Sequence, residues 1–562
     1  MPREPRPDAP TCPRCGKPGM CRGGRDHGGK PSWICVKSYK PRVVCLQTND
    51  VTKWMPIGAK VETFADVKAR GAKTVTPTAE LDYDEVTEVG PTTFSRDLAG
   101  ARTFVITSAQ NATPPNLEFL GCLRTMAAAK KAELIVCPYR YRNATSAWTE
   151  AQQQAEWWSP EFLPYLLNTR LEVAPGLVLL ADVSIQPTAS EPLSGFDAMT
   201  GMASGIVGHP KVALQSIAGP GSGAAKLMLS SGACTLPNYT STKAGKQGEF
   251  HHSYSAVVVE VDDAGYHVRH VSFDSSTSTV VDLAHEYHAD GRVEEAERPV
   301  AIVLGDVHVG TTAEHVDRAT FGAGGIVEYL QPEHIVAGDV MDSMSCNPHS
   351  AGDPFIATAL AGSDRDDVRA EVEAAWQWMV NRTPAGCTFV AVADNHGDML
   401  RRWLCSPSVD WKRDPRNAAF YLELAGKLVA SAHMTSGGPR YAGALKTAFE
   451  ALPMPADKSI RVLNEDESFV LAGVELGIHG NRGPNGSRGS IRNLRRLGHK
   501  SVIGHSHTAG ISEGTYQVGT STELRLGYNA GPSSWSHAHC VVHANGKRQM
   551  LFIRRDGVWR RG

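Results

Sequence analysis

With 562 residues, the chain is longer than one hydrophobic core usually serves, and two to four domains are expected. Hydrophobic residues at 41% and charged residues at 21% are typical of a globular protein and exclude a disordered or fibrous one. No apolar run reaches the roughly 20 residues that span a bilayer, and the N-terminus lacks the apolar segment of a secretory signal. We therefore expect a cytoplasmic protein without a membrane partner.

The net charge of −2 conceals a basic, cysteine-rich block at residues 1–60. This block carries twelve lysines or arginines against four acids. Four of its cysteines have spacings that suit thiolate ligands of one structural Zn²⁺, namely Cys12, Cys15, Cys21 and Cys35. His27 or Cys45 could replace one of the last two, so the fourth ligand stays open. The block resembles the small zinc ribbons of primases and other DNA-handling enzymes.

Residues 61–100 contain a stretch bearing Thr, Glu and Pro, which is typical of a linker. The next block, residues 101–295, is predicted to be an α/β domain of unknown role, and it could form the interface of a homo-oligomer. The segment "TFVITSA" predicts a strand, "NLEFLGCLRTMAAAKKA" a helix and "ELIVCPYRYR" a second strand. This order predicts two parallel strands joined by a crossover helix.

The third block, residues 296–562, repeats one pattern: a short apolar strand followed by polar residues that can bind metal. The strands "AIVL", "HIVA", "CTFVAVA", "SFVLAGVELG" and "KSVI" all precede such residues. In α/β folds, ligand sites collect where several strands end at the same edge. Seven candidate ligands follow these strands: Asp306, His308, Asp339, Asn395, His479, His505 and His507.

The mixture of imidazole and carboxylate ligands suits Mn²⁺, Fe or Zn²⁺, whereas a cage of oxygens alone would suit Mg²⁺ or Ca²⁺. Seven ligands are too many for one tetrahedral ion. They suit two divalent cations that share a bridging carboxylate and lie about 3.5–4 Å apart, as in two-metal phosphoryl-transfer sites. The residues therefore predict a pair of divalent cations, which could be Mn²⁺, Fe or Zn²⁺.

The motifs Gly-Asp-x-His, Gly-Asp-x-x-Asp, Asn-His, Gly-x-His and Gly-His-x-His, in this order, resemble the calcineurin-like metallophosphoesterase superfamily over about residues 298–550. The resemblance implies a four-layer α/β fold of two packed β-sheets flanked by helices. It also implies that His396 lies over the scissile phosphate and protonates the leaving oxygen. The implied ligands of one cation are Asp306, His308, Asp339 and His507, and those of the other are Asp339, Asn395, His479 and His505.

The third motif departs from the family pattern, which has Gly before the Asn-His pair and an acid directly after it. Here Asp394 precedes the pair and Gly397 follows it, with Asp398 one place further on. The departure leaves open whether Asp398 has taken over the orienting role of the usual acid. Asp398 and Asp342 could each orient a neighbouring ligand or cap a helix.

A second basic segment, residues 476–512, contains no acid, and most of its basic residues lie between the His479 and His505 motifs. Ser490 is typical of a helix N-cap, and "IRNLRRLG" predicts a short helix that ends at Gly498. A solvated surface without a partner is the alternative to a nucleic-acid contact, and the basic N-terminus favours DNA. The candidate DNA-binding residues are Arg482, Arg488, Arg492, Arg495 and Arg496.

Segments of the middle block, among them "FVITSAQNATPPN", "QPTASEPLSGFDAMTG" and "KAGKQGEFHH", resemble the early nuclease by which certain tailed phages degrade host DNA. This second resemblance extends over most of residues 100–550 and implies the cytoplasm of an infected cell. Two histidine pairs lie outside the predicted metal site. We expect His251 and His252 in a loop before a strand, and a structural role for His537 and His539.

Together these observations predict a Mn²⁺-dependent DNA nuclease that hydrolyses phosphodiester bonds at a two-metal site of the metallophosphoesterase nuclease branch. One alternative is a phosphatase that acts on small or protein phosphomonoesters. The other is a DNA-binding or assembly protein whose metal site is vestigial. The presence of all seven ligands argues against the last alternative.

Overall fold

The computed structural model describes residues 93–141, 158–220 and 225–560, together with the backbone of three strands nearer the N-terminus. The chain divides into two compact units, Met1–Glu85 and Val86–Gly562. The first contains an antiparallel sheet of β1 (Cys21–Arg25), β2 (Pro31–Tyr39) and β3 (Arg42–Thr48). Cys12, Cys15 and residues 61–92 of the predicted linker lie outside the described residues, as do the side chains of Cys21 and Cys35. The zinc site stays a prediction.

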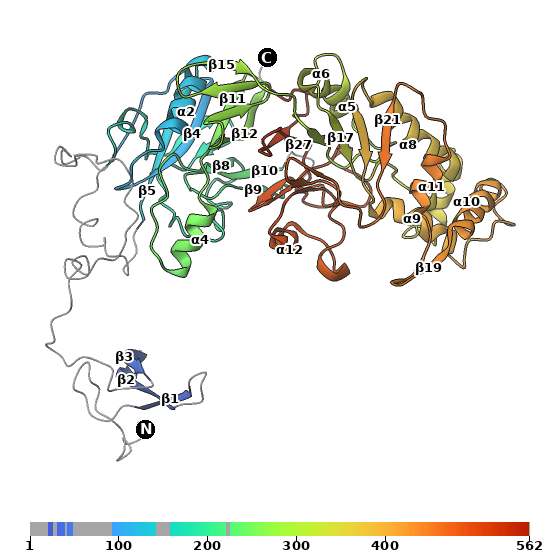
Figure 1. The fold of residues 1–562 in the computed structure, drawn as a ribbon, viewed down its shortest axis with the longest axis horizontal. Coiled ribbons are helices and arrows are strands. Elements are labelled where there is room, and N and C mark those ends of the chain that lie inside the picture. The colour runs from blue at the N-terminus through green and yellow to red at the C-terminus, as the bar shows by residue number, and fades with distance from the viewer. Residues whose placement is uncertain are drawn as a thin grey trace. The chain divides into compact units, whose positions relative to one another are not determined.

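The unit Val86–Gly562 has a mixed α/β fold built on three large sheets (Figure 1). Strands from residues 101–295 and from residues 296–562 share the largest sheet, because β9 and β25 pair with Leu214 opposite Ile511. Among the described residues, no helix is long and apolar enough to cross a membrane. The ten strands of this sheet are, in order, β22 (Val470–Leu471), β23 (Val474–Glu475), β24 (Lys500–Ile503), β26 (Thr515–Gln517), β25 (Gly510–Ser512), β9 (Ala213–Ile217), β10 (Lys226–Ser230), β8 (Ser204–Val207), β7 (Leu177–Leu179) and β6 (Leu171–Ala174).

A seven-stranded sheet contains the predicted strand–helix–strand unit. Helix α2 (Leu117–Lys130) connects β4 and β5, which are parallel, so the prediction of a crossover helix is confirmed. The helix begins where the Asn116 side chain accepts a hydrogen bond from Phe119 N, a common N-cap arrangement. The strands of this sheet are β15 (Val293–Glu295), β14 (His285–His288), β13 (Thr279–Asp282), β12 (Gly265–Asp274), β11 (Ser255–Asp262), β4 (Thr103–Gln110) and β5 (Glu133–Tyr139).

A six-stranded sheet carries most of the helices of the C-terminal region. Its first four strands are parallel, the fifth is antiparallel to them, and the sixth is antiparallel to the fifth: β21 (Ser459–Val462), β18 (Thr388–Ala391), β17 (His334–Ala337), β16 (Ala301–Val303), β27 (Ala538–Val542) and β28 (Arg548–Phe552). The helices of this region are α5 (Glu314–Phe321), α6 (Ile326–Leu330), α7 (Pro354–Gly362), α8 (Val368–Arg382), α9 (Asn395–Cys405), α10 (Ala418–Ser431) and α11 (Ala444–Glu450). The remaining elements are α4 (Lys243–His251), α12 (Ile491–Leu494) and the hairpin of β19 (His433–Thr435) with β20 (Gly438–Arg440).

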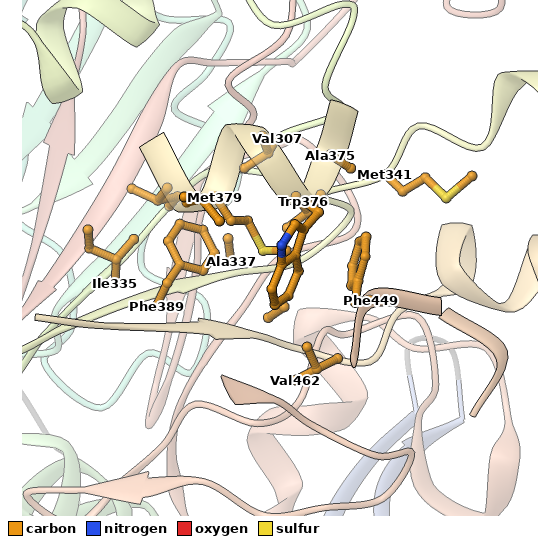
Figure 2. Packing of buried hydrophobic residues seen from close by; sticks show 14 of the residues in the cluster. Val307, Ile335, Ala337, Met341, Ala375, Trp376, Met379, Phe389, Phe449 and Val462 are labelled. Carbon is orange, nitrogen blue, oxygen red and sulfur yellow. The ribbon is translucent and has the colours of Figure 1, made fainter. Parts of the chain in front are cut away.

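The central strands alternate between two cores because successive side chains of a strand point to opposite faces. In β17, Ile335 and Ala337 belong to the core beneath the helices. Val336 belongs instead to a core that contains residues of all three large sheets. Figure 2 shows the helix side, where Trp376 and Met379 of α8 lie over the sheet. Both cores therefore hold the strand ends that carry the candidate ligands.

A buried group of charges joins the seven-stranded and six-stranded sheets. Arg269 of β12 donates two hydrogen bonds to Glu260 of β11 (2.9 and 2.8 Å) and two to Asp282 of β13 (2.6 and 2.8 Å). Gln549 of β28 also donates to Asp282 (2.9 Å), and the Lys130 ammonium lies 2.8 Å from the same carboxylate. The guanidinium thus balances two carboxylates that have little access to water.

We predict that Arg269→Leu lowers the free energy of unfolding by about 3–5 kcal/mol, because it leaves two buried carboxylates with one remaining cation. The exposed Arg292, which pairs with Asp290 and Glu294, provides the matched control. Arg292→Leu should leave the free energy of unfolding close to that of wild type, because an exposed ion pair contributes little to stability. Urea denaturation measures both values, and equal losses in the two variants would contradict the structural role of the buried group.

The same cluster predicts a loss of stability in acid. Burial opposes ionisation of Asp282, but the charges of Arg269 and Lys130 outweigh it and hold its pKa well below the usual range. The stability that this carboxylate supplies is therefore present above its unfolded pKa of about 3.9 and is lost as the pH falls further. Asp282→Asn should flatten the dependence of the urea midpoint on pH below about 4, and an unchanged slope would argue against this assignment.

Candidate metal centre

Five strand ends bring the predicted motifs together. Strands β16, β17 and β18 are parallel neighbours, and Asp306, Asp339 and Asn395 follow them. Strands β23 and β24 are parallel neighbours in the ten-stranded sheet, and His479 and His505 follow these. The carboxyl ends of two sheets therefore supply the candidate ligands.

Apolar residues between the ligands fix the direction of the polar side chains. Val307, between Asp306 and His308, is fully buried in the core beneath the helices, and Met341 after Asp339 lies in the same core. Figure 2 shows both apolar side chains on the helix side. The polar side chains of the same segments converge on one another instead.

Asp339 lies at the centre of three groups of side chains that could hold a metal ion. Within each group, the potential ligand atoms all lie within 4.8 Å of one another. Its partners in the three groups are Asp306 with His507, His479 with His505, and His308 with His396. Asp339 is thus the one carboxylate that every group shares.

The four side chains proposed for the first cation converge closely. The Nε2 atoms of His308 and His507 lie 3.1 Å apart, and His507 Nε2 lies 3.4 Å from Asp306 Oδ2. His308 Nε2 is 3.5 Å from Asp339 Oδ2. Two nitrogen ligands, each about 2.1 Å from one ion, can be at most about 4.2 Å apart, so these separations permit a shared cation.

The second set converges on the other side of Asp339. His479 Nε2 lies 3.1 Å from Asp339 Oδ2, and His505 Nδ1 lies 2.8 Å from Asn395 Oδ1. Asp339 and His479 are buried, whereas Asn395, His505 and His396 are only partly so. The accessible side of the centre is therefore the side of Asn395, His396 and His505.

The electrostatics of the centre fit a bound cation. Asp306 Oδ2 and Asp339 Oδ1 are buried and have no hydrogen-bond partner among the described residues. Burial raises the pKa of Asp306 well above its usual range, whereas the imidazoles led by His479 outweigh burial and hold the pKa of Asp339 low. A buried carboxylate without a partner is costly, and a divalent ion would supply the missing charge. The donor set of carboxylate, imidazole and amide suits Mn²⁺, Fe or Zn²⁺.

Asp342 orients two histidines at once. Its carboxylate accepts a hydrogen bond from His308 Nδ1 (3.0 Å), and its backbone carbonyl accepts one from His396 Nδ1 (2.6 Å). These bonds leave the Nε2 atoms of both rings for other partners. Of the two uses predicted for this aspartate, orientation of a ligand is therefore the one found.

The acid that accompanies the Asn-His pair is Asp394 and not Asp398. Asp394 accepts a hydrogen bond from the backbone N of Asp339 (2.6 Å) and caps helix α9 through Gly397 N (2.6 Å). Burial, followed by the charge of Asp339, raises the pKa of Asp394 to about 6. Asp398 instead pairs with Arg401 (2.6 Å), so the hypothesis that it took over the orienting role is wrong.

Four candidate ligands have a left-handed backbone, which is unfavourable for residues other than glycine. Their φ angles are 47° for His308, 49° for Asp339, 73° for His505 and 58° for His507. Two glycines of the motifs have a different role: each lets a candidate ligand approach the backbone closely. A Cβ on Gly338 would overlap the His479 ring, and one on Gly504 would overlap the Asp306 carboxylate. The motif glycines therefore make room for the ligands.

The predicted basic helix is confirmed as α12 followed by a 3-10 turn, with Ser490 as its N-cap and Gly498 at its end. Arg482 pairs with Glu465 (3.0 Å) and Arg495 with Glu191 (3.0 Å). The exposed guanidinium groups of Arg488, Arg492 and Arg496 form no ion pair with any residue that the structure describes. Arg488 is near enough to the centre for its charge to contribute to the low pKa of His505.

The two histidine pairs outside the predicted ligand set belong to none of the three potential metal-binding groups. His251 is the last residue of α4, so the expected loop begins one residue later, and His252 bonds to Tyr239 and Thr235. His539 accepts from Gly305 N (2.9 Å), and His537 bonds to the Thr522 carbonyl oxygen (2.8 Å). The predicted structural role of the latter pair is confirmed.

No sequence motif indicated two aromatic residues that lie near the centre. The ring centroids of Trp535 and His507 lie 4.2 Å apart, and those of Tyr528 and Trp535 lie 5.7 Å apart. Tyr528 is 65% exposed, although Asp342, Asp339 and Asp306 are close enough to contribute, after burial, to a raised pKa of its hydroxyl. An exposed aromatic surface therefore adjoins the candidate ligands.

The chain is similar to a curated phage protein. It is 31% identical to Protein A1 of Escherichia phage T5 over 466 residues, which cover 80% of this chain and 81% of that protein. The chain belongs to the Protein A1 family. No protein-family model matches it, and no solved structure matches it. The similarity covers most of the length of both proteins.

We predict that Asp342→Asn weakens Mn²⁺ binding about 10- to 100-fold, because the His308 ring loses the carboxylate that orients it. Asp398→Asn is the matched control, since this aspartate follows the neighbouring motif but, among the residues that the structure describes, pairs only with Arg401. Isothermal titration calorimetry with Mn²⁺ measures both affinities. Equal affinities in the two variants would show that Asp342 does not act on a metal ligand.

Proposed function

We propose that this chain is a divalent-metal-dependent DNA nuclease with a metallophosphoesterase catalytic fold at residues 296–562. The observation that carries the proposal is the buried carboxylate of Asp339, which belongs to three potential metal-binding groups at once. A carboxylate between two sets of ligands is the arrangement that a two-cation site needs. The layered sheets and helices around it are compatible with the four-layer fold of the superfamily.

In this proposal, two cations share Asp339, and Mn²⁺ is favoured over Fe or Zn²⁺. When bound, the cations would activate the attacking water and offset charge on the phosphate oxygens. The first would be held with Asp306, His308 and His507, and the second with Asn395, His479 and His505. The buried ligands exclude bulk water, whereas the half-buried side of the centre admits the substrate.

His396 is proposed as the proton donor to the leaving oxygen. The hydrogen bond from Nδ1 to the Asp342 carbonyl oxygen (2.6 Å) fixes the ring and leaves Nε2 to donate the proton. Burial opposes the charged form of His396, but the carboxylate of Asp339 and the bond to Asp342 outweigh burial and raise its pKa. A raised pKa favours the protonated form, which general-acid catalysis requires.

A nucleic-acid substrate is supported by the surroundings of the centre. The exposed Arg488 can contact a phosphate of the backbone, and Tyr528 offers a ring on which a base could stack. The basic block at residues 1–60 would add phosphate contacts. Because the relative from Escherichia phage T5 is a phage protein, we further propose that the substrate is host DNA during infection.

We predict that His396→Ala lowers kcat for DNA cleavage by about 10²- to 10⁴-fold, because the leaving oxygen loses its proton donor. Asp339→Asn should abolish cleavage, since both cations lose a ligand. The exposed His433→Ala is the matched control and should behave like wild type. End-labelled single- and double-stranded DNA with Mn²⁺, Mg²⁺ or Zn²⁺ gives the readout.

The same assay separates the alternatives. Turnover of a chromogenic phosphomonoester without cleavage of DNA would indicate a phosphatase. Salt-dependent DNA binding without cleavage under any of these metals would indicate a binding protein with a vestigial site. Either outcome would overturn the nuclease proposal.

We predict that Arg488→Ala weakens DNA binding and reduces the slope of log K against log salt by about 0.9, the contribution of one phosphate contact. Arg413→Ala changes the charge equally at an exposed site outside the centre and should leave the slope unchanged. Fluorescence anisotropy of a labelled duplex in EDTA measures binding without cleavage. Identical slopes for the two variants would remove Arg488 from the interface.

A further inference from the structure

A basic cavity of about 620 Å³ lies apart from the candidate metal centre. All three large sheets contribute to its wall, among other residues Phe273 of β12, Lys500 of β24 and Arg548 of β28. Lys500 begins the strand after which His505 follows, so about 15 Å of extended chain separates the cavity from the centre. The cavity therefore has its own set of side chains.

The charge of the cavity is strongly positive. Five lysines and arginines line it, against the single carboxylate of Glu513: Lys211, Arg495, Lys500, Lys547 and Arg548. Glu513 is already shared, because Lys211 lies 3.0 Å from it and Arg495 lies 3.8 Å from it. The one acid in the wall cannot also neutralise the remaining cations.

Three neighbouring cations have no carboxylate partner among the described residues. Lys500 is exposed, Lys547 is half-buried, and Arg548 donates only to the carbonyls of Ser501 (3.0 Å) and Gly514 (2.6 Å). Burial lowers the pKa of Lys547; the nearby carboxylate of Asp274 opposes this shift, and the positive charges of Lys500 and Arg548 add to it. A fold that holds like charges together gains stability when an anion binds between them.

Aromatic residues complete the wall of the cavity. Phe250, at the end of α4, is 84% exposed, and its ring lies against that of His251 (5.0 Å between centroids). Such a ring offers a stacking surface for a nucleobase. The volume is within the range of small-ligand pockets and is too large for a phosphate ion alone.

We propose that this cavity binds a single nucleotide, with the phosphate between Lys500, Lys547 and Arg548 and the base against Phe250. The volume suits one nucleotide rather than a run of nucleotides, and it lies at the opposite end of β24 from the metal centre. The proposal is independent of the nuclease activity, because it requires neither cation nor cleavage.

The test is isothermal titration calorimetry of the full-length protein with 2′-deoxyadenosine 5′-monophosphate, with and without EDTA. Lys500→Glu should weaken binding at least tenfold in both buffers. Lys412→Glu makes the same charge change at an exposed residue outside the cavity and should stay within twofold of wild type. Binding that is absent, or equal in the two variants, would overturn the proposal.

A second variant tests the position of the base. Phe250→Ala should weaken binding of the nucleotide at least threefold and leave binding of inorganic phosphate unchanged. A competing oligothymidylate series distinguishes a nucleotide site from a path for a strand. If affinity rises steadily with the length of the oligonucleotide while the mononucleotide binds no better than phosphate, the cavity is part of a nucleic-acid interface and the proposal fails. Because the EDTA arm needs no metal, its result is separate from the outcome of the cleavage assays.

Discussion

The buried carboxylate of Asp339 is the constraint on which the rest of the centre depends. Its side chain joins every group of potential ligands, and its backbone N donates to Asp394, which in turn caps helix α9. The second motif thereby fixes the position of the third, so Asn395 and His396 enter the centre in the first turn of that helix. Substitution of the Asp339 side chain would therefore change the charge of the centre, whereas its backbone N would still hold Asp394 and helix α9 in place.

The ten-stranded sheet explains why the catalytic region proposed at residues 296–562 is continuous with the residues before it. Strands β23 and β24, which lead to His479 and His505, lie in the same sheet as β9 and β10 from the preceding region. The buried bond from Gln549 to Asp282 joins the other two sheets across the same boundary. The preceding region thus stabilises the position of two candidate ligands, even though it supplies none itself.

Much of the centre could be predicted because each of its motifs is a short, continuous stretch of sequence. Short apolar strands followed by Asp, Asn or His are visible in the sequence, and strands that end at one edge bring such residues together. The roles of Asp342 and Asp398 were not separable, because both are aspartates just after a motif and only the path of each loop decides what they reach. The pairing of β9 with β25 joins distant segments and leaves no periodic signal in either. Trp535 was missed for the same reason: its contact with His507 depends on a long-range fold.

The backbone of the centre bears on whether the site is vestigial. Left-handed conformations at His308, Asp339, His505 and His507 each cost of order 1 kcal/mol or more, and glycine at any of them would relieve that cost. The two buried carboxylates add a further penalty, because Asp306 Oδ2 and Asp339 Oδ1 have no hydrogen-bond partner among the described residues. A protein that used this surface only to bind DNA would gain stability by replacing these residues. This geometry lowers the stability of the fold unless cations occupy the centre. It therefore argues against a vestigial metal site.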